Sequence, residues 1–116
     1  MPKIKCYDIV REILDEAAIQ FGPQYVEVKE YSDILRQYCE KIDIIADEFD
    51  AVSYDVDVDE FEKTISITIE TVDLSLDNPN HLFYKIASKS LSVRFSYGDD
   101  GYLATTFVFP SVWEAA

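Results

Sequence analysis

One histidine, two cysteines and a run of alternating aspartates are the residues of this chain whose types could support chemistry. His81 stands alone, and no serine or cysteine has the sequence context of an activated nucleophile. A dyad would have to be assembled in space, so we expect His81 to serve the structure. The many carboxylates leave a glycosidase-like acid pair open, but nothing in the sequence selects one pair.

The run DVDVD at 55–59 begins like a calcium-binding loop. Such a loop has glycine at its sixth position and glutamate at its twelfth, whereas this chain has Glu60 and Ser66 there. Valines between the acids instead indicate a strand with its carboxylates on one face. A glycine-rich phosphate loop is also missing from the sequence. The sequence therefore predicts no catalytic residue, no cofactor and no metal site, and a protein that is not an enzyme.

Composition limits the class of protein. A chain of 116 residues suits one domain with its own core, and 48% hydrophobic residues argue against disorder. A net charge of −13 disfavours nucleic acid and anionic membranes and favours basic partners. No apolar run approaches the roughly 20 residues of a membrane span, and residues 1–16 lack the apolar core of a secretory signal. We therefore expect a cytoplasmic protein that binds neither nucleic acid nor membrane.

The stretch 52–72 predicts a β-hairpin, because apolar and polar residues alternate along both of its halves. Only one register puts both apolar sets on the same face, since a shift of one residue would turn one set into water. The predicted pairs are Val58 with Ile65, Val56 with Ile67 and Tyr54 with Ile69. After Glu70 the apolar phase changes, which leaves either a bulge between Glu70 and Val72 or the end of the strand.

Two helices are predicted before this hairpin, because apolar residues recur three and four positions apart on both sides of Gly22 and Pro23. The second helix begins either just after Pro23 or after a short extended piece at 25–28, with Ser32 as a candidate N-cap.

Folding the two helices about this corner brings Cys6 near Cys39. We expect both to be free thiols in the core, with a disulfide or a redox role as the alternative.

The second half predicts a short helix that ends near Ser88, with Asn78 as its cap and Pro79 at its first position. A second hairpin follows over 91–109. A three-residue loop at 99–101, with Gly101 left-handed, collects the most apolar area on one face. The predicted pairs are Tyr97 with Leu103, Phe95 with Thr105, Val93 with Phe107 and Leu91 with Phe109. Pro110 should end the ladder.

These elements predict a single α+β domain over 1–116. A helical hairpin at 4–49 and the short helix are expected on one face of an antiparallel sheet of four or five strands, within 52–110. The tail 111–116 carries Trp113, which we expect to fold back over the core, with an exposed anchor for a partner as the alternative.

The missing chemistry favours a non-enzymatic binding or adaptor module that acts through protein contacts. An acidic inhibitor of a basic nuclease, either an immunity protein or a nucleic-acid mimic, is the first alternative, with Glu27 and Glu30 as further contacts. A small-ligand binder or an enzyme with a spatially assembled site is the second. Monomer and homodimer stay open, since the strand from Val52 or the last strand could be a sheet edge. The candidate partner-binding residues are Asp55, Asp57, Asp59, Glu60, Glu62 and Trp113.

Overall fold

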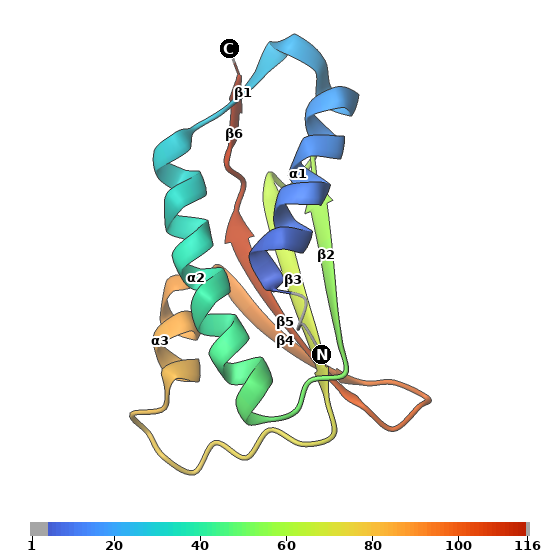
Figure 1. The fold of residues 1–116 in the computed structure, drawn as a ribbon, viewed down its shortest axis with the longest axis vertical. Coiled ribbons are helices and arrows are strands. Elements are labelled where there is room, and N and C mark those ends of the chain that lie inside the picture. Colours follow the sequence, from blue (N-terminus) through green and yellow to red (C-terminus); the bar gives the residue numbers. More distant parts are fainter. Residues whose placement is uncertain (1–4, 116) are drawn as a thin grey trace.

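The computed structural model describes residues 5–115 and has the α+β fold that the sequence predicts. Its helices are α1 (Cys6–Phe21), the 3-10 helix η1 (Gly22–Gln24), α2 (Lys29–Glu48) and α3 (Leu82–Lys89). Its strands are β1 (Tyr25–Glu27), β2 (Ser53–Asp59), β3 (Thr64–Thr71), β4 (Ser92–Tyr97), β5 (Leu103–Pro110) and β6 (Trp113–Ala115). Figure 1 shows α1 and α2 side by side in front of the larger sheet, with α3 beside the lower part of α2.

The larger sheet has four antiparallel strands in the order β2-β3-β5-β4. The predicted register of the first hairpin is confirmed, because Val56 lies opposite Ile67 and every other predicted pair follows. On its other side Ile67 lies opposite Phe107. These residues form the centre of a core that α1, α2 and α3 cover from one side.

The second hairpin also has its predicted loop and register. Gly101 has a φ of +84°, and Val93 lies opposite Phe107. The ladder ends earlier than predicted, because Ser92 opposite Val108 is its last pair. Leu91 does not face Phe109; its N–H donates to the carbonyl of Val108 at 2.7 Å. The last long strand, β5, is central and not an edge, so the edges of the sheet are β2 and β4.

The structure decides two alternatives that the sequence left open, the start of α2 and the end of β3, and corrects the predicted cap of α2. α2 follows the short extended piece β1, and its N-cap is Val28. Ser32 is therefore not the cap but lies buried inside the first turn, where its Oγ is 3.4 Å from the hydroxyl of Tyr7. β3 continues in phase to a buried Thr71 and ends there, so no bulge forms.

The start of α3 is a further correction. Asn78 and Pro79 form a turn before the helix, in which Asn78 Oδ1 accepts the N–H of Asn80 at 2.9 Å. The cap is His81, whose Nδ1 accepts the N–H of Phe83 at 3.0 Å. Its Nε2 therefore carries the proton and reaches the two carboxylate oxygens of Glu48 at 2.8 and 2.9 Å. His81 thus fastens α3 to α2.

The tail folds back and pairs with the corner between the two long helices. β6 is antiparallel to β1, with Trp113 opposite Glu27. The small two-stranded sheet closes the end of the molecule opposite the β4–β5 loop (Figure 1).

We expect Gly101→Ala to lower the unfolding free energy by about 1–2 kcal/mol, because an L-residue is strained at this positive φ. A Cβ at this position would meet no atom within 4 Å, so crowding adds nothing to the cost. Gly101→Asn is the control, since asparagine tolerates the left-handed region better and should lose less. Urea denaturation of the three proteins measures the difference. Equal losses for Ala and Asn would contradict a backbone cause.

Candidate functional site

The acidic residues that the sequence singles out on the first hairpin lie in different settings. Asp55 and Asp57 are exposed along the edge strand β2, and Glu62 is exposed in the turn. Asp59 is engaged by its own turn, because its Oδ1 accepts the N–H groups of Phe61 and Glu62 at 2.9 and 3.0 Å. All four residues are therefore exposed, and Asp59 in addition accepts hydrogen bonds within the hairpin turn.

Glu27 and Glu30 are the two further acids considered for an inhibitor, and Glu27 is paired with Arg11 inside the fold. Glu27 accepts two hydrogen bonds from Arg11, at 2.7 and 3.1 Å, which join α1 to β1. The hydrogen bond to Glu27 raises the pKa of the Arg11 guanidinium. Glu30 is exposed on the first turn of α2.

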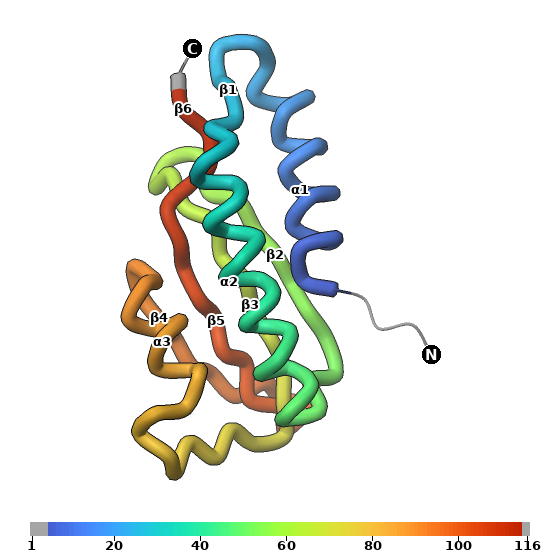
Figure 2. The backbone as a smooth tube through the Cα atoms, turned by 60° about the vertical axis from the view of Figure 1, so that its left-hand side comes forward, coloured from blue at the N-terminus to red at the C-terminus, as the bar shows by residue number. Residues whose placement is uncertain are grey.

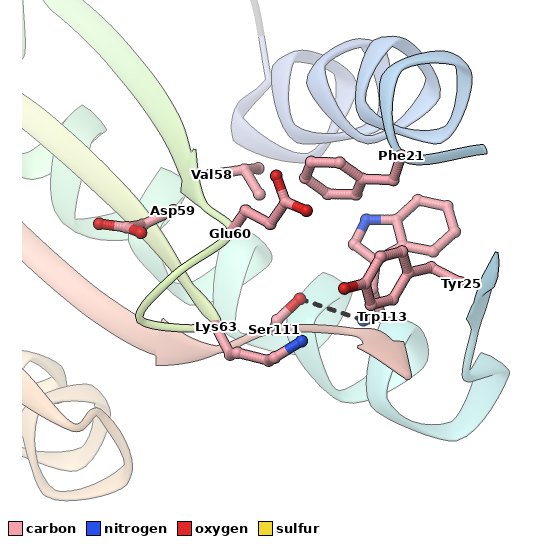
Figure 3. A pocket seen from close by; sticks show the side chains of 8 residues that line it. All are labelled: Phe21, Tyr25, Val58, Asp59, Glu60, Lys63, Ser111 and Trp113. Atoms are coloured by element: carbon pink, nitrogen blue, oxygen red, sulfur yellow. Dashed lines mark hydrogen bonds between the residues drawn. The ribbon is translucent and has the colours of Figure 1, made fainter. Parts of the chain in front are cut away.

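Glu60 and Trp113 are brought together at a small cavity (Figure 3). The cavity measures about 10 Å³, which is room for about one water molecule. The indole Nε1 of Trp113 is buried and has no hydrogen-bond partner within residues 5–115. The indole ring packs edge-on against Phe21 with ring centroids 6.4 Å apart. This cavity is too small for any ligand larger than water, so we assign it to the packing of the tail.

The two cysteines lie in contact in the core. Cys6 and Cys39 are both free thiols with no exposed surface. A hydrogen bond between the two thiols, followed by burial, raises the pKa of Cys6. A protonated, buried thiol is a poor nucleophile.

Asp43 forms a partly buried polar contact beside these thiols. Its Oδ1 accepts the backbone N–H of Cys6 at 2.9 Å and the hydroxyl of Tyr54 at 2.6 Å. Burial, and then the hydrogen bond to Asp43, raise the pKa of Tyr54. The carboxylate thereby ties the start of α1 and the strand β2 to the middle of α2.

A larger hollow is a groove of about 380 Å³ between α2 and the end of β5. Its lining is mostly apolar and aromatic. It consists of Tyr31, Ile34, Leu35 and Tyr38 from α2, Lys89 from the end of α3, and Phe109, Pro110 and Ser111. Tyr38 stacks on Phe109 with ring centroids 5.1 Å apart, and the Lys41 ammonium lies 5.9 Å from the centroid of the same tyrosine ring. The groove therefore combines an apolar floor with nearby positive charge.

Unequal element lengths create this groove. β5 continues to Pro110, but β4 begins at Ser92 opposite Val108, so within residues 5–115 the end of β5 pairs with no strand on that side. In β5 the odd-numbered residues bond to β3 and the even-numbered ones to β4, as the bond from the Ser111 N–H to Lys63 shows. Pro110 is even-numbered and lacks the N–H that a longer β4 would need. α3 also stops at Lys89, which leaves the α2 side chains above it uncovered.

Sequence reasoning missed the groove, although one signal was present. Tyr31, Leu35 and Tyr38 belong to the apolar stripe of α2, and Ile34 widens this stripe beyond what α1 and the sheet can cover. Ile34 and Tyr31 stay 39% and 45% exposed. When the apolar stripe of a helix is wider than the elements packed on it can cover, the sequence indicates a further contact on that helix.

Comparisons of the chain with protein-family models, with curated protein sequences and with solved structures found no significant match. In the part of the chain that the structure describes, no three His, Cys, Asp or Glu side chains are placed to hold a metal ion. Between residues 5 and 115 no helix is both long and apolar enough to cross a membrane.

We expect neither thiol of the native protein to react with a water-soluble disulfide reagent. Both thiols are buried out of reach of the reagent, and the raised pKa of Cys6 also keeps that thiol protonated at neutral pH. Absorbance of the released thiol should report no reaction in buffer and two reacting groups in denaturant. A rapid reaction of the folded protein would revive the redox alternative.

We expect the unfolding free energy to fall as the pH rises above about 9, because the fold raises the pKa of both Cys6 and Tyr54, and to fall more steeply above about 10. Unfolded Tyr54 ionises near the ordinary tyrosine pKa of about 10, whereas the fold raises its pKa and keeps it protonated. The unfolded state then binds fewer protons than the native state, so stability is lost with rising pH. Urea denaturation between about pH 8 and about pH 11 measures the slope.

Two variants test how much of this dependence of stability on pH comes from Tyr54. Tyr54→Phe should reduce the slope above about pH 10 and leave the part that comes from Cys6. It should also lower the unfolding free energy at neutral pH by about 1.5–3 kcal/mol, the range for a hydrogen bond to a charged group. Tyr97→Phe, at a tyrosine that is 76% exposed, should leave both quantities unchanged. An unchanged slope in Tyr54→Phe would assign the alkaline loss to other groups.

Proposed function

We propose that this protein is a non-enzymatic binding module, and that its partner places an amphipathic helix in the groove between α2 and the end of β5. This proposal rests on one observation: α3 is much shorter than α2 and leaves part of α2 uncovered. α2 has 20 residues and α3 has 8, which correspond to about 30 Å and about 12 Å of helix. In Figures 1 and 2 α3 covers only the lower part of α2 on its side.

The spacing of the lining residues favours a helical partner. Tyr31, Ile34, Leu35 and Tyr38 stand at positions i, i+3, i+4 and i+7 of α2. This is the stripe that one helix presents to another helix packed alongside it. The uncovered stretch spans about two turns, so a partner helix of two to three turns would complete the layer above α3.

The charge near the groove favours an acidic partner helix. The chain carries a net charge of −13, yet the charged side chain that lines the groove is Lys89, and Lys41 lies over the ring of Tyr38. An acidic residue on the partner helix would meet these lysines at the rim, where charge pairing steers association. Apolar partner side chains would fill the floor beside Phe109. This pattern also supports partner choice, since the rest of the acidic surface repels acidic chains.

A photoreactive amino acid at position 34 tests this proposal. Ile34 lines the groove, whereas Ile44 is an exposed isoleucine of the same helix outside it, so the same amino acid at position 44 is the matched control. After irradiation in a lysate of the source cells, mass spectrometry of the cross-linked peptides identifies what lay against each position. We expect position 34 alone to capture a peptide with apolar residues three and four apart and at least one acid.

We expect Ile34→Lys to weaken binding of that captured peptide by roughly 10- to 100-fold, because it removes about 1.5–3 kcal/mol of apolar burial. Ile44→Lys should leave the affinity unchanged. Fluorescence of the single tryptophan or isothermal titration measures both constants. Equal loss in the two variants would contradict a groove-specific contact, and capture of small molecules alone at position 34 would instead favour the small-ligand alternative.

A further inference from the structure

The two edges of the four-stranded sheet are treated differently. β2 carries Asp55, Asp57 and Asp59, and charged edge residues prevent other strands from pairing there. β4, with the sequence SVRFSY, carries no acid and a single charge, at Arg94. The usual protection of an edge is therefore present on one side of the sheet and missing on the other.

The backbone of β4 has unused hydrogen-bonding groups. The N–H of Gly98 donates to the carbonyl of Tyr102 at 3.0 Å, which fixes the phase of the ladder. By alternation, Ser92, Arg94 and Ser96 bond to β5, whereas the N–H and C=O groups of Val93, Phe95 and Tyr97 point away from it. In the part of the chain that the structure describes, no strand pairs with this outer side.

Large apolar side chains lie exposed along the same edge. Leu91 is 61% exposed, Phe95 is 54% exposed and Tyr97 is 76% exposed. Phe95 is held in place by Phe83 of α3, with ring centroids 6.0 Å apart. Exposed apolar residues beside an open strand edge mark a contact surface.

Charge selects the occupant of this edge. Residues 78–98 contain none of the 23 acids of the chain and three of its ten Lys and Arg residues. Two copies of a chain with net charge −13 repel each other over most of their surfaces. The acid-free segment is where they can approach with the least repulsion between acids.

The sequence of β4 is also complementary to itself. In an antiparallel pair of two β4 strands centred on Phe95, Phe95 lies opposite Phe95 of the second copy and Val93 lies opposite Tyr97. Arg94 then lies opposite Ser96, so the two arginines do not oppose each other. A register centred on Arg94 would place like charges opposite each other, which is destabilising. We propose that two copies of this chain pair through β4 in the Phe95-centred register and join their sheets into one.

This dimer uses a surface separate from the groove of the proposed function, so either proposal can fail alone. Sedimentation equilibrium of the full chain, up to about 1 mM, measures the association. We expect a monomer–dimer equilibrium that Phe95→Lys weakens by about tenfold or more, because it places a charge at the centre of the seam. Phe61→Lys is the matched control, since Phe61 is 97% exposed on the first hairpin and should leave the dimer intact. Circular dichroism verifies that both variants fold.

A cysteine scan tests the register without relying on a disruptive variant. Val93→Cys, Phe95→Cys and Tyr97→Cys are oxidised in turn, and the unmodified chain is the background because its two thiols are buried. Only Phe95→Cys should form a disulfide-linked dimer, since position 95 alone faces itself across the seam. A monomer at all concentrations would overturn the proposal and leave β4 to a different chain. A dimer that withstands Phe95→Lys and links through none of the three positions would overturn it as well.

Discussion

Strand β3 has to bury its odd-numbered side chains while it pairs with a strand on each side, and the other elements are arranged around that requirement. Ile65, Ile67 and Ile69 have no exposed surface. Since side chains alternate strictly along a strand, β2 and β5 must each present their own apolar set on the same face. The helices then cover that face, and α3 packs on it through Phe83 against Phe107. A one-residue slip in either ladder would turn the apolar set of the slipped strand toward solvent.

The same ladder explains why the fold leaves two surfaces open. In β5 the bonding direction alternates, so Pro110 interrupts pairing toward β4 while Ser111 still bonds toward β3. The sheet is therefore wider at its middle than at the end near the tail, and the groove forms where β4 and α3 are both missing. The outer side of β4 stays open for a separate reason, because nothing in the described chain extends the sheet beyond it. Neither surface requires catalytic chemistry, and both suit contacts with another polypeptide.

Local patterns predicted the parts of this fold that depend on neighbouring residues. The registers of both hairpins and the left-handed Gly101 follow from alternation and turn chemistry within about twenty residues. The cap of α3 was missed because histidine is not among the usual N-cap residues. The contact of His81 with Glu48 joins residues 33 positions apart in the chain, which local spacing does not reveal. Likewise the pairing of β1 with β6 joins residues about ninety positions apart. Strands of three residues are too short for an alternating pattern that would predict this pairing. The groove was missed for the same reason, since it arises from where elements stop.

The distribution of charge connects the two proposed surfaces and weighs against an inhibitor that imitates nucleic acid. Such a mimic needs its acids gathered on one face. Here Asp59 accepts hydrogen bonds within its own turn, and Glu27 is paired with Arg11. Asp55 and Asp57 lie along the edge strand β2, where their charges prevent pairing with another strand. Both proposed contacts instead border the acid-free segment 78–98, which supplies Lys89 to the groove and Arg94 to β4. In both proposals the acidic surface excludes contacts, and the partner binds beside the longest segment without acids.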